Sequence, residues 1–568
     1  MVHRFTNGFG MLIFGLGLVW TSVAHSGVAP VEPDWSSAPD WSVNAQIDPS
    51  GRPNPYGWPE GVFEEKVRKG KLHALQYPLG ITGLLVPERQ SLRVLDSKPG
   101  DPLFGLMRAA LSLGSEFKDF KGFWKWLGLH DYPAQEGEIP FPKGVRPELP
   151  MGVSLIERNG VRGVTLSCAA CHSASLFGRP VLGLTNRFPR ANSFFVHGKQ
   201  ATRWITPKLF RSVTGAKREE VRMYAETRER ISSVGLKMPE VLGLDTSLAQ
   251  VALSLARRAG TPWAERDAAT AARPRPNPLE TQVADSKPAP WWNVKYKTRW
   301  LSDGSVISGN PIFTNFLWNE IGRGADLLEL VRWMEQNREI IEDLTTSVFA
   351  TRAPKWNEYL SAYPIDLPRA QRGERLYRES CAGCHGHYDK NWIEPDAGKT
   401  LGVRYATRTQ VKNVGTDPGR REGMKELARA LNPLRFSQEY GIVIEEQTGY
   451  VPPPLEGIFA RFPYFHNNSI PNLCALMTPP EKRPVTYYSG EAKDPSTDFD
   501  PDCVGYPTGP KTPTAWKTAP DAAEHLFDTT RLGLSNSGHY RKIFTREDGS
   551  EKFTPSEKRE LIEFLKTL

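Results

Sequence analysis

Two short motifs carry the residue types in this chain that are best suited to chemistry. Each has the pattern Cys-x-x-Cys-His, and they comprise Cys168-Ala169-Ala170-Cys171-His172 and Cys381-Ala382-Gly383-Cys384-His385. In this pattern the two thiols can add to the vinyl groups of a haem, and the adjacent imidazole can bind its iron. With 6 Cys and 11 His in 568 residues, chance would supply on the order of 0.001 such motifs. The sequence therefore predicts two covalently attached c-type haems.

Two other kinds of site also use Cys-x-x-Cys pairs. One zinc ion could take both pairs, but roughly two hundred residues separate them, against about 15–20 in compact zinc modules. A thioredoxin-like dithiol explains neither the second copy nor the histidine that follows each pair. Haem attachment accounts for all of these features.

The first 26 residues have the features of a secretory signal peptide. Arg4 supplies a positive start, residues 11–19 form an apolar stretch too short to span a bilayer, and Ala24 and Ser26 are small residues before a cleavage point. An uncleaved membrane anchor is the alternative. We expect an exported protein, periplasmic or secreted, which suits c-type haem attachment outside the cytoplasm.

Composition and charge bound the remaining chain. The formal net charge is +8, but Lys and Arg are dispersed without a basic stripe, so we expect no nucleic acid partner. The 48 Pro and 49 Gly predict a loop-rich chain with short helices. We expect a mainly α fold with many loops and two cytochrome c-like haem domains. The chain is longer than a single hydrophobic core usually supports, so we expect more than one domain. The expected division is a loop-rich extension over 27–148, an N-terminal haem domain with linker and inter-haem segment over 149–365, and a C-terminal cytochrome c domain over 366–568.

Several stretches have the pattern of regular elements. Residues 149–168 alternate enough to be extended and lead into the first motif. Helical periodicity is found over 217–234, 245–259, 326–344, 369–380 and 554–568. The last of these opens with Thr554-Pro555-Ser556-Glu557, a capping box with proline at the first helical position.

Two cysteines remain after haem attachment has used four. They are Cys474 and Cys503, and in an oxidising compartment they could form a disulfide. Two small buried thiols that never meet are the alternative, and the sequence does not decide between them.

A helix before the second motif and another at the C-terminus are typical of cytochrome c domains, and residues 366–568 resemble that fold. The two-haem layout resembles the bacterial dihaem cytochrome c peroxidase superfamily, which includes MauG-type enzymes and rubber oxygenases. Residues 462–473 are similar to its P-Y-x-H-x-G-S-x-x-x-L segment, departing at Asn468, where glycine is usual. Stretches similar to the rubber oxygenase branch are Trp291-Trp292 with Lys295-Tyr296-Lys297 and Asp303-Gly304, Arg483-Pro484 with Asp500-Pro501 and Val504-Gly505, and Asn536-Ser537-Gly538-His539. The resemblance begins near residue 149.

The resemblance implies unequal haems. An iron with a free axial position can activate O2 or peroxide, whereas one with both positions filled transfers electrons. For the second haem, it implies that His539 binds opposite His385. The alternatives for that position are Met477, His466 and His387.

For the first haem, His172 is the expected iron ligand and no opposite ligand stands out. His197 is the nearest histidine in sequence, but at that spacing a propionate or backbone partner is more usual than a ligand. We expect an open or weakly held sixth position, with apolar residues such as Ile307 or Phe313 near it.

The resemblance also places one tryptophan between the haems, linking them electronically. Trp292 is our choice of the Trp291-Trp292 pair, and an aromatic wedge in the domain interface is the alternative.

Together these features predict a haem oxidoreductase that activates O2 or hydrogen peroxide at the N-terminal haem, with the C-terminal haem as electron relay. Oxygenase chemistry on an apolar organic substrate and peroxidase chemistry both remain open. The other candidate functions are a pure electron-transfer dihaem cytochrome and a MauG-like oxidation of a partner protein.

Overall fold

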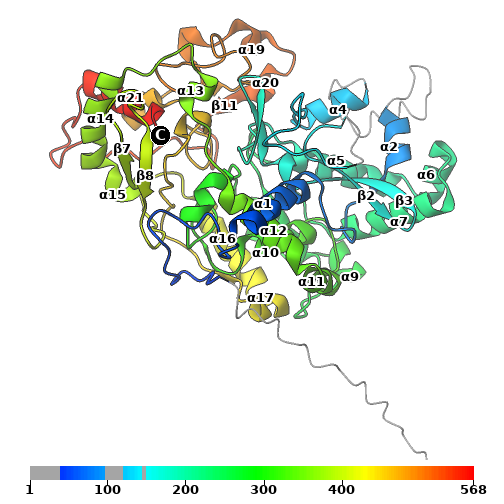
Figure 1. The fold of residues 1–568 in the computed structure, drawn as a ribbon. Coiled ribbons are helices and arrows are strands. Elements are labelled where there is room, and N and C mark those ends of the chain that lie inside the picture. The colour runs from blue at the N-terminus through cyan, green and yellow to red at the C-terminus, as the bar shows by residue number, and fades with distance from the viewer. Residues whose placement is uncertain (1–38, 96–118, 144–148) are drawn as a thin grey trace, which may run out of the picture. The chain divides into compact units, whose positions relative to one another are not determined.

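Helices and loops dominate the computed structural model, and its strands are short (Figure 1). It describes residues 39–95, 119–143 and 149–568, so the signal peptide expected over 1–26 lies outside the described residues. The mainly α, loop-rich class is confirmed. Within the described ranges, no helix combines the length and apolar character that crossing a bilayer requires.

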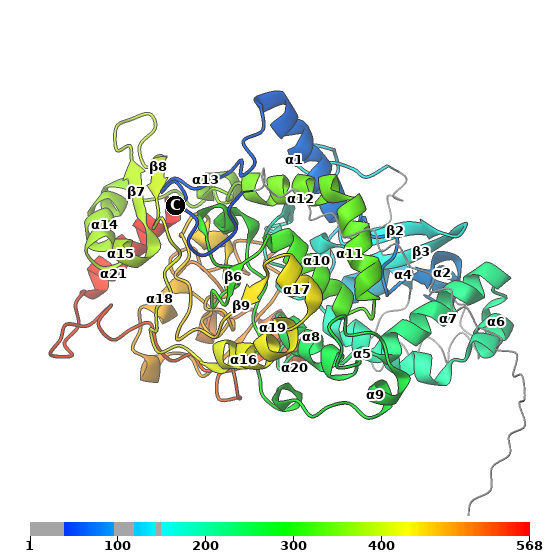
Figure 2. The ribbon, with the colours of Figure 1, turned by 90° about the horizontal axis from the view of Figure 1, so that it is seen from below.

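The region predicted as a loop-rich extension contains helices. Its elements are α1 (Glu60–Leu75), β1 (Val86–Pro87), α2 (Glu88–Leu95) and α4 (Phe120–Trp126). α1 packs along α12 (Arg338–Ala350), as Figures 1 and 2 show. A Cβ atom on Gly70 would lie 2.0 Å from the Asp343 carbonyl oxygen, so only glycine permits this approach. Lys66 on α1 also donates a 3.0 Å hydrogen bond to the Asp343 carboxylate.

An antiparallel hairpin leads into the first motif. β2 (Val153–Arg158) pairs with β3 (Val161–Leu166), and β1 pairs with the other side of β3. Asn159 and Gly160 form the two-residue turn with φ of 53° and 72°, the left-handed pair that a tight hairpin favours. The extended chain expected over 149–168 is therefore confirmed, and β3 ends two residues before Cys168.

The helices between the motifs build the N-terminal half. They are α5 (Ala191–Trp204), α6 (Pro207–Thr214), α7 (Arg218–Ser232), α8 (Ser247–Ala256), α9 (Ala268–Ala272), α10 (Pro311–Ile321), α11 (Leu327–Gln336), α12 and α13 (Trp356–Tyr359). Helices predicted over 217–234 and 245–259 are confirmed as α7 and α8. The single helix predicted over 326–344 is wrong, because the chain breaks at Asn337, whose side chain donates to the Trp333 carbonyl and competes with the helical backbone.

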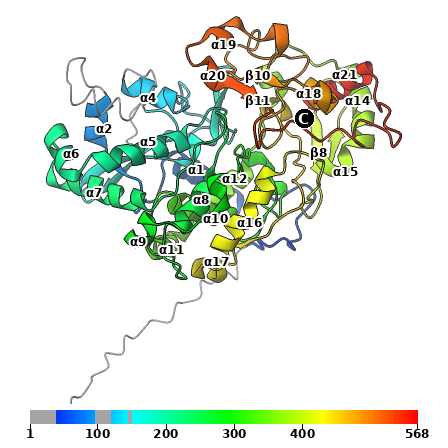
Figure 3. The ribbon, with the colours of Figure 1, turned by 180° about the vertical axis from the view of Figure 1, so that it is seen from behind.

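The C-terminal module contains the pair of helices predicted there. α14 (Leu367–Ser380) packs against α21 (Pro555–Lys566), and Figures 1 and 3 show them side by side. A Cβ atom on Gly373 would lie 1.9 Å from the Glu560 carbonyl oxygen, which shows how closely the helices approach. The predicted capping box is confirmed, since the Thr554 hydroxyl accepts from the Glu557 amide and the Glu557 carboxylate accepts from the Thr554 amide.

Short elements connect these helices. They are β4 (Ser173–Leu176), β5 (Arg179–Leu182), β6 (Val306–Ser308), α15 (Ala382–His385), β7 (His387–Lys390), β8 (Thr400–Arg404), α16 (Gly419–Leu431), α17 (Arg435–Glu439), β9 (Val443–Ile444), α18 (Leu473–Leu476), β10 (Thr486–Tyr488), α19 (Thr514–Thr518), α20 (Ala522–His525) and β11 (Leu526–Asp528).

Two large hydrophobic cores organise the described residues, and both cross the boundary predicted at residue 365. The first surrounds α8, α10, α11 and α12 but also includes side chains of α16 and β9. The second surrounds α14 and α21 but also includes residues from β4 and the segment that begins at Trp292. Packing therefore joins the two halves of the chain. A domain boundary at residue 365 stays a prediction from the sequence.

Candidate haem-binding sites

The second motif occupies one tight turn at the end of α14. The amides of Cys384 and His385 both donate to the Cys381 carbonyl, at 3.1 and 2.9 Å, so the motif curls into α15. Gly386 follows with φ of 85° and ends the helix. Both thiols are free and half-buried, and burial raises the pKa of Cys381 to about 12. The thiolate is the reactive form of cysteine, so a thiol with so high a pKa is a poor nucleophile. This argues against the thioredoxin-like alternative.

The His385 imidazole is oriented by a backbone carbonyl. Its Nδ1 lies 2.7 Å from the Pro453 oxygen. Burial lowers the pKa of His385 to about 4, the Pro453 carbonyl opposes that change, and the nearby Arg461 charge adds to it. The ring is therefore neutral, with Nδ1–H donating to Pro453 and Nε2 left as a lone-pair donor. This is the arrangement typical of metal-binding histidines.

His539 faces His385 from a constrained loop. The two ring centroids lie 6.1 Å apart. His539 has φ of 50°, and its amide donates to the Val414 carbonyl at 2.7 Å. A Cβ atom on Gly538 would lie 2.3 Å from the Gly415 carbonyl carbon, so the loop cannot approach this neighbour without glycine. Burial lowers the pKa of His539 to about 3, so this ring is neutral as well.

The spacing of these two rings fits a haem iron between them. Two imidazoles bound to opposite faces of one metal, each nitrogen about 2 Å from it, have centroids roughly 6 Å apart. The other residues considered for that position have different surroundings: His466 stacks on Tyr450 at 4.0 Å, Met477 is buried in the second core, and His387 is exposed on β7. Ligation by His539 stays a prediction that this geometry favours.

The first motif is held by side chains from its flanks. The Asn186 side chain donates to the Ala170 carbonyl at 2.8 Å, and the Ser173 hydroxyl donates to the Ala169 carbonyl at 2.6 Å. Burial raises the pKa of Cys168 to about 11 and that of Cys171 to about 12. Within the described ranges, no three His, Cys, Asp or Glu side chains gather closely enough to hold a metal ion, so a zinc site shared by both pairs has no geometric support.

His172 has a different neighbour from His385. Its ring lies 5.6 Å from that of Trp291, tilted by 40°, and this is the one aromatic or imidazole ring contact that the described residues make with it. Burial lowers the pKa of His172 to about 4, against an opposing effect of the Ala289 backbone. The chain is fixed here, because the Trp291 amide donates to the Gly183 carbonyl and the Gly183 amide donates to the His172 carbonyl.

The remaining residues expected near the first haem have contacts elsewhere. His197 lies 6.3 Å from the Trp126 ring, and its Nδ1 is buried without a hydrogen-bond partner. Phe313 packs against Tyr440 at 4.4 Å. The Ile307 carbonyl accepts from the amide of Val43. Proximity of Ile307 or Phe313 to the iron therefore stays a prediction without a supporting contact.

The two adjacent tryptophans face different partners from one short helical turn, residues Trp291–Tyr296. Trp291 contacts His172 and belongs to the first core, whereas Trp292 is fully buried in the second. The Trp292 Nε1–H donates to the Glu456 carbonyl at 2.9 Å, three residues after Pro453. The sequence led us to choose Trp292 alone, and the contact of Trp291 with His172 was missed. The second tryptophan of the pair was the signal that could have indicated it.

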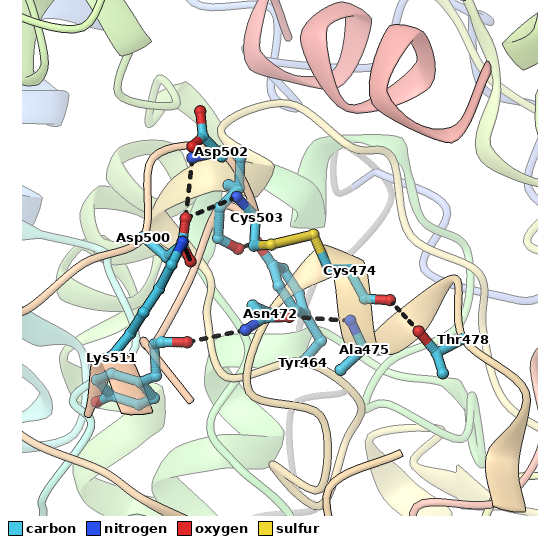
Figure 4. Close-up of a disulfide and its surroundings, with 11 residues drawn as sticks. Tyr464, Asn472, Cys474, Ala475, Thr478, Asp500, Asp502, Cys503 and Lys511 are labelled. Carbon is cyan, nitrogen blue, oxygen red and sulfur yellow. Dashed lines mark hydrogen bonds and ion pairs between the residues drawn. A yellow bond between two sulfur atoms is a disulfide. The ribbon is translucent and has the colours of Figure 1, made fainter. Parts of the chain in front are cut away.

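The two remaining cysteines do pair. Cys474 and Cys503 form a disulfide with Cα atoms 5.0 Å apart (Figure 4). Around it, the Asp500 carboxylate accepts from the Cys503 amide and pairs with Lys511 at 2.9 Å, which fixes the loop that carries Cys503.

Two family models match the C-terminal part of the chain. One, described as cytochrome C oxidase, cbb3-type, subunit III, matches residues 368–431 and so includes the second motif. The other, described as RoxA-like, cytochrome c-like, matches residues 449–488, which contain Pro453 and Glu456. Neither match reaches the first motif.

Two curated relatives share part of the chain. The uncharacterized protein y4iJ of Sinorhizobium fredii (strain NBRC 101917 / NGR234) is 28% identical over 268 residues, covering 38% of this chain and 41% of the relative. The uncharacterized protein y4iM of the same strain is 27% identical over 242 residues, covering 36% of this chain and 50% of the relative. The matches thus span half or less of each relative's length. Taken with the fold, the family matches show that the chain carries cytochrome c-like domains at its C-terminus, which imply c-type haem and a haem-based redox role.

Proposed function

We propose that the protein is an exported dihaem oxidoreductase that activates O2 or hydrogen peroxide at the N-terminal haem, with the C-terminal haem as electron relay. Cys168 and Cys171 would hold one haem, with His172 on its iron. Cys381 and Cys384 would hold the other, with His385 and His539 on its iron. When bound, haem supplies one-electron redox chemistry and, where an axial position is free, a site for O2 or peroxide.

The observation that carries this proposal is the inequality of the two motif histidines. His385 has a second imidazole at 6.1 Å and a carbonyl on its Nδ1, as a saturated electron-transfer site requires. His172 has the Trp291 ring as its neighbour among the described residues. Among the described residues, no second imidazole ring faces His172, and a haem iron with a free axial position is able to take an external molecule.

The residues between the motifs support electron relay. Trp291 contacts His172, and its neighbour Trp292 donates to the Glu456 carbonyl in the same loop that binds His385 through Pro453. A ring contact, covalent bonds and hydrogen bonds therefore connect the two imidazoles. Trp292, in the middle of this route, is fully buried.

Export is supported by the Cys474–Cys503 disulfide, because disulfides persist in oxidising compartments. The same compartment is where c-type haem attachment would occur. Its test is the mature N-terminus of protein purified from the periplasm or medium, where cleavage after Ser26 is expected and an intact start at Met1 would contradict export by this signal.

Spectroscopy of two matched variants tests the assignment of roles. In the His539→Ala holoprotein, one low-spin haem should become high-spin, and the other haem's spectrum should be unchanged. His172→Ala should abolish the reaction with O2 or peroxide and leave the low-spin signal in place. Turnover that survives His172→Ala would show that the reactive haem is not the N-terminal one.

The same spectra distinguish this function from pure electron transfer. The paired rings of His385 and His539 favour pure electron transfer at the C-terminal haem alone. Reduced wild-type protein should bind CO at one haem. Two low-spin haems that both ignore CO would establish an electron carrier. Comparing turnover with O2 and an apolar organic substrate against turnover with hydrogen peroxide then distinguishes oxygenase from peroxidase chemistry.

A further inference from the structure

Four cationic side chains act on one another or on shared neighbours near the second motif. They are Lys287, Lys297, Arg420 and Arg461. Lys297 and Arg420 are each only 5% exposed. Burial is also the main cause that lowers the pKa of Lys287, Lys297 and Arg461, with that of Lys297 reaching about 8 and that of Arg461 about 10.

Electrostatic effects connect the four cations, either directly or through a shared neighbour. The Arg461 charge lowers the pKa of both lysines, in addition to burial. Arg420 and Lys287 both add to the burial that lowers the pKa of His466 to about 3. The group is therefore one electrostatic cluster, which we name the cationic cluster.

The partners of the cationic cluster are largely neutral backbone carbonyls. The Lys287 ammonium donates to the carbonyls of Arg461, at 3.1 Å, and of Pro463. Arg461 Nη1 donates to the Pro454 carbonyl at 2.9 Å. Arg420 Nη1 donates to the Ala284 carbonyl, while its Nε is buried without a hydrogen-bond partner.

Carboxylates do not balance these charges. Asp303 is fully buried near Lys297 and Arg420, and Asp417 is buried near Tyr450, whereas Arg187 adds a further positive charge near Lys287. Cations therefore outnumber carboxylates here. Within the described residues, no carboxylate oxygen lies within 4.0 Å of any of the four cations. Burying an uncompensated ion costs several kcal/mol, so the cluster favours an anionic partner.

The position of the cluster identifies that anion by its chemistry. Arg461 binds the carbonyl next to that of Pro453, which orients His385, and its charge acts on the His385 ring. Lys297 directly follows the turn that carries Trp292. A haem held at Cys381 and Cys384 would bring two propionate carboxylates into this neighbourhood, and arginine and lysine are the usual partners of carboxylates.

We propose that Lys287, Lys297 and Arg461 bind the propionates of the haem attached at Cys381 and Cys384. This inference rests on the proposed function, because it requires a haem at that motif. Reduction adds one electron to the haem, and a nearby cation stabilises the added negative charge. The cluster therefore raises the midpoint potential of the C-terminal haem relative to a protein without these charges.

The test is a redox titration of the holoprotein, monitored by optical and EPR spectra that resolve both haems. Lys297→Gln removes the charge, and Lys297→Arg keeps it. The midpoint potential of the low-spin haem should fall in Lys297→Gln and stay near the wild-type value in Lys297→Arg. Lys199→Gln is the matched control, because burial lowers the pKa of Lys199 to about 8, as it does that of Lys297. The Lys199 ammonium donates to the carbonyls of Ser232 and Val234.

Each outcome of this titration decides the inference. A potential that falls in Lys297→Gln, and neither in Lys297→Arg nor in Lys199→Gln, supports it. Equal potentials in wild type and Lys297→Gln, or a shift confined to the CO-binding haem, overturn it while leaving the proposed function intact. Absence of haem from the Cys381–Cys384 peptide of wild-type protein, measured by mass spectrometry, would overturn both.

Discussion

Replacing His466 with phenylalanine should make the protein less sensitive to mild acid. His466 stacks on Tyr450 with ring centroids 4.0 Å apart, so a phenyl ring can keep the packing. Burial, helped by Arg420 and Lys287, lowers the pKa of His466 from its ordinary 6.5 to about 3. The folded protein therefore holds this imidazole neutral at pH values where the unfolded chain protonates it.

The sign and size of the effect follow from this difference. Because the folded-state pKa is lowered, the stability linked to this site is complete above pH 6.5 and is lost as pH falls towards 3. At about 1.4 kcal/mol for each pH unit below the unfolded value, holding His466 neutral costs roughly 2 kcal/mol at pH 5 and little at pH 7. The variant should gain about 2 kcal/mol relative to wild type between these two pH values.

Urea unfolding of the holoprotein, followed by circular dichroism from pH 7.5 to pH 5, measures this difference. His387→Phe is the control, since it also replaces a histidine by phenylalanine, but at an exposed position. It should not reproduce the pH-dependent gain of His466→Phe. A wild-type and His466→Phe pair whose stabilities fall in parallel would refute the reasoning, because it would mean that His466 takes up a proton in the folded state.

Three further changes probe packing, the relay and the disulfide. Gly373→Ala should destabilise the protein by about 1–3 kcal/mol, since its Cβ would lie 1.9 Å from the Glu560 carbonyl oxygen. Gly198→Ala, a helix position with open space, should instead stabilise it by about 0.5–1 kcal/mol, and thermal unfolding compares the two. Trp292→Phe removes the 2.9 Å hydrogen bond to the Glu456 carbonyl and should lower the free energy of unfolding by about 1–3 kcal/mol. It should also slow electron transfer between the haems, measured by flash photolysis. An unchanged rate would exclude Trp292 from the route. Replacing Cys474 and Cys503 together by alanine should lower the free energy of unfolding by about 2–4 kcal/mol, and equal urea midpoints for variant and wild type would contradict this.

Local features were predictable from the sequence because they depend on neighbouring residues. The capping box at Thr554 fixes the start of α21 through bonds between residues three apart, and α7 and α8 follow their apolar periodicity. The two haem motifs are equally local. In contrast, the helix break at Asn337 was missed, because a polar side chain that bonds its own backbone leaves no mark in the apolar pattern.

Tertiary structure decided which residues meet across long stretches of chain. Only folding brings His539 to 6.1 Å from His385, turns Trp291 towards His172, and joins Cys474 to Cys503. The cationic cluster also depends on tertiary structure, since its members are far apart in the sequence and differ from surface lysines and arginines in their burial. Sequence by itself determined the cofactor chemistry and the cytochrome-like ends of the C-terminal module. The difference between the surroundings of His172 and His385 depends on contacts between segments that are far apart in the sequence. Packing brings these segments together, and no local pattern predicts it.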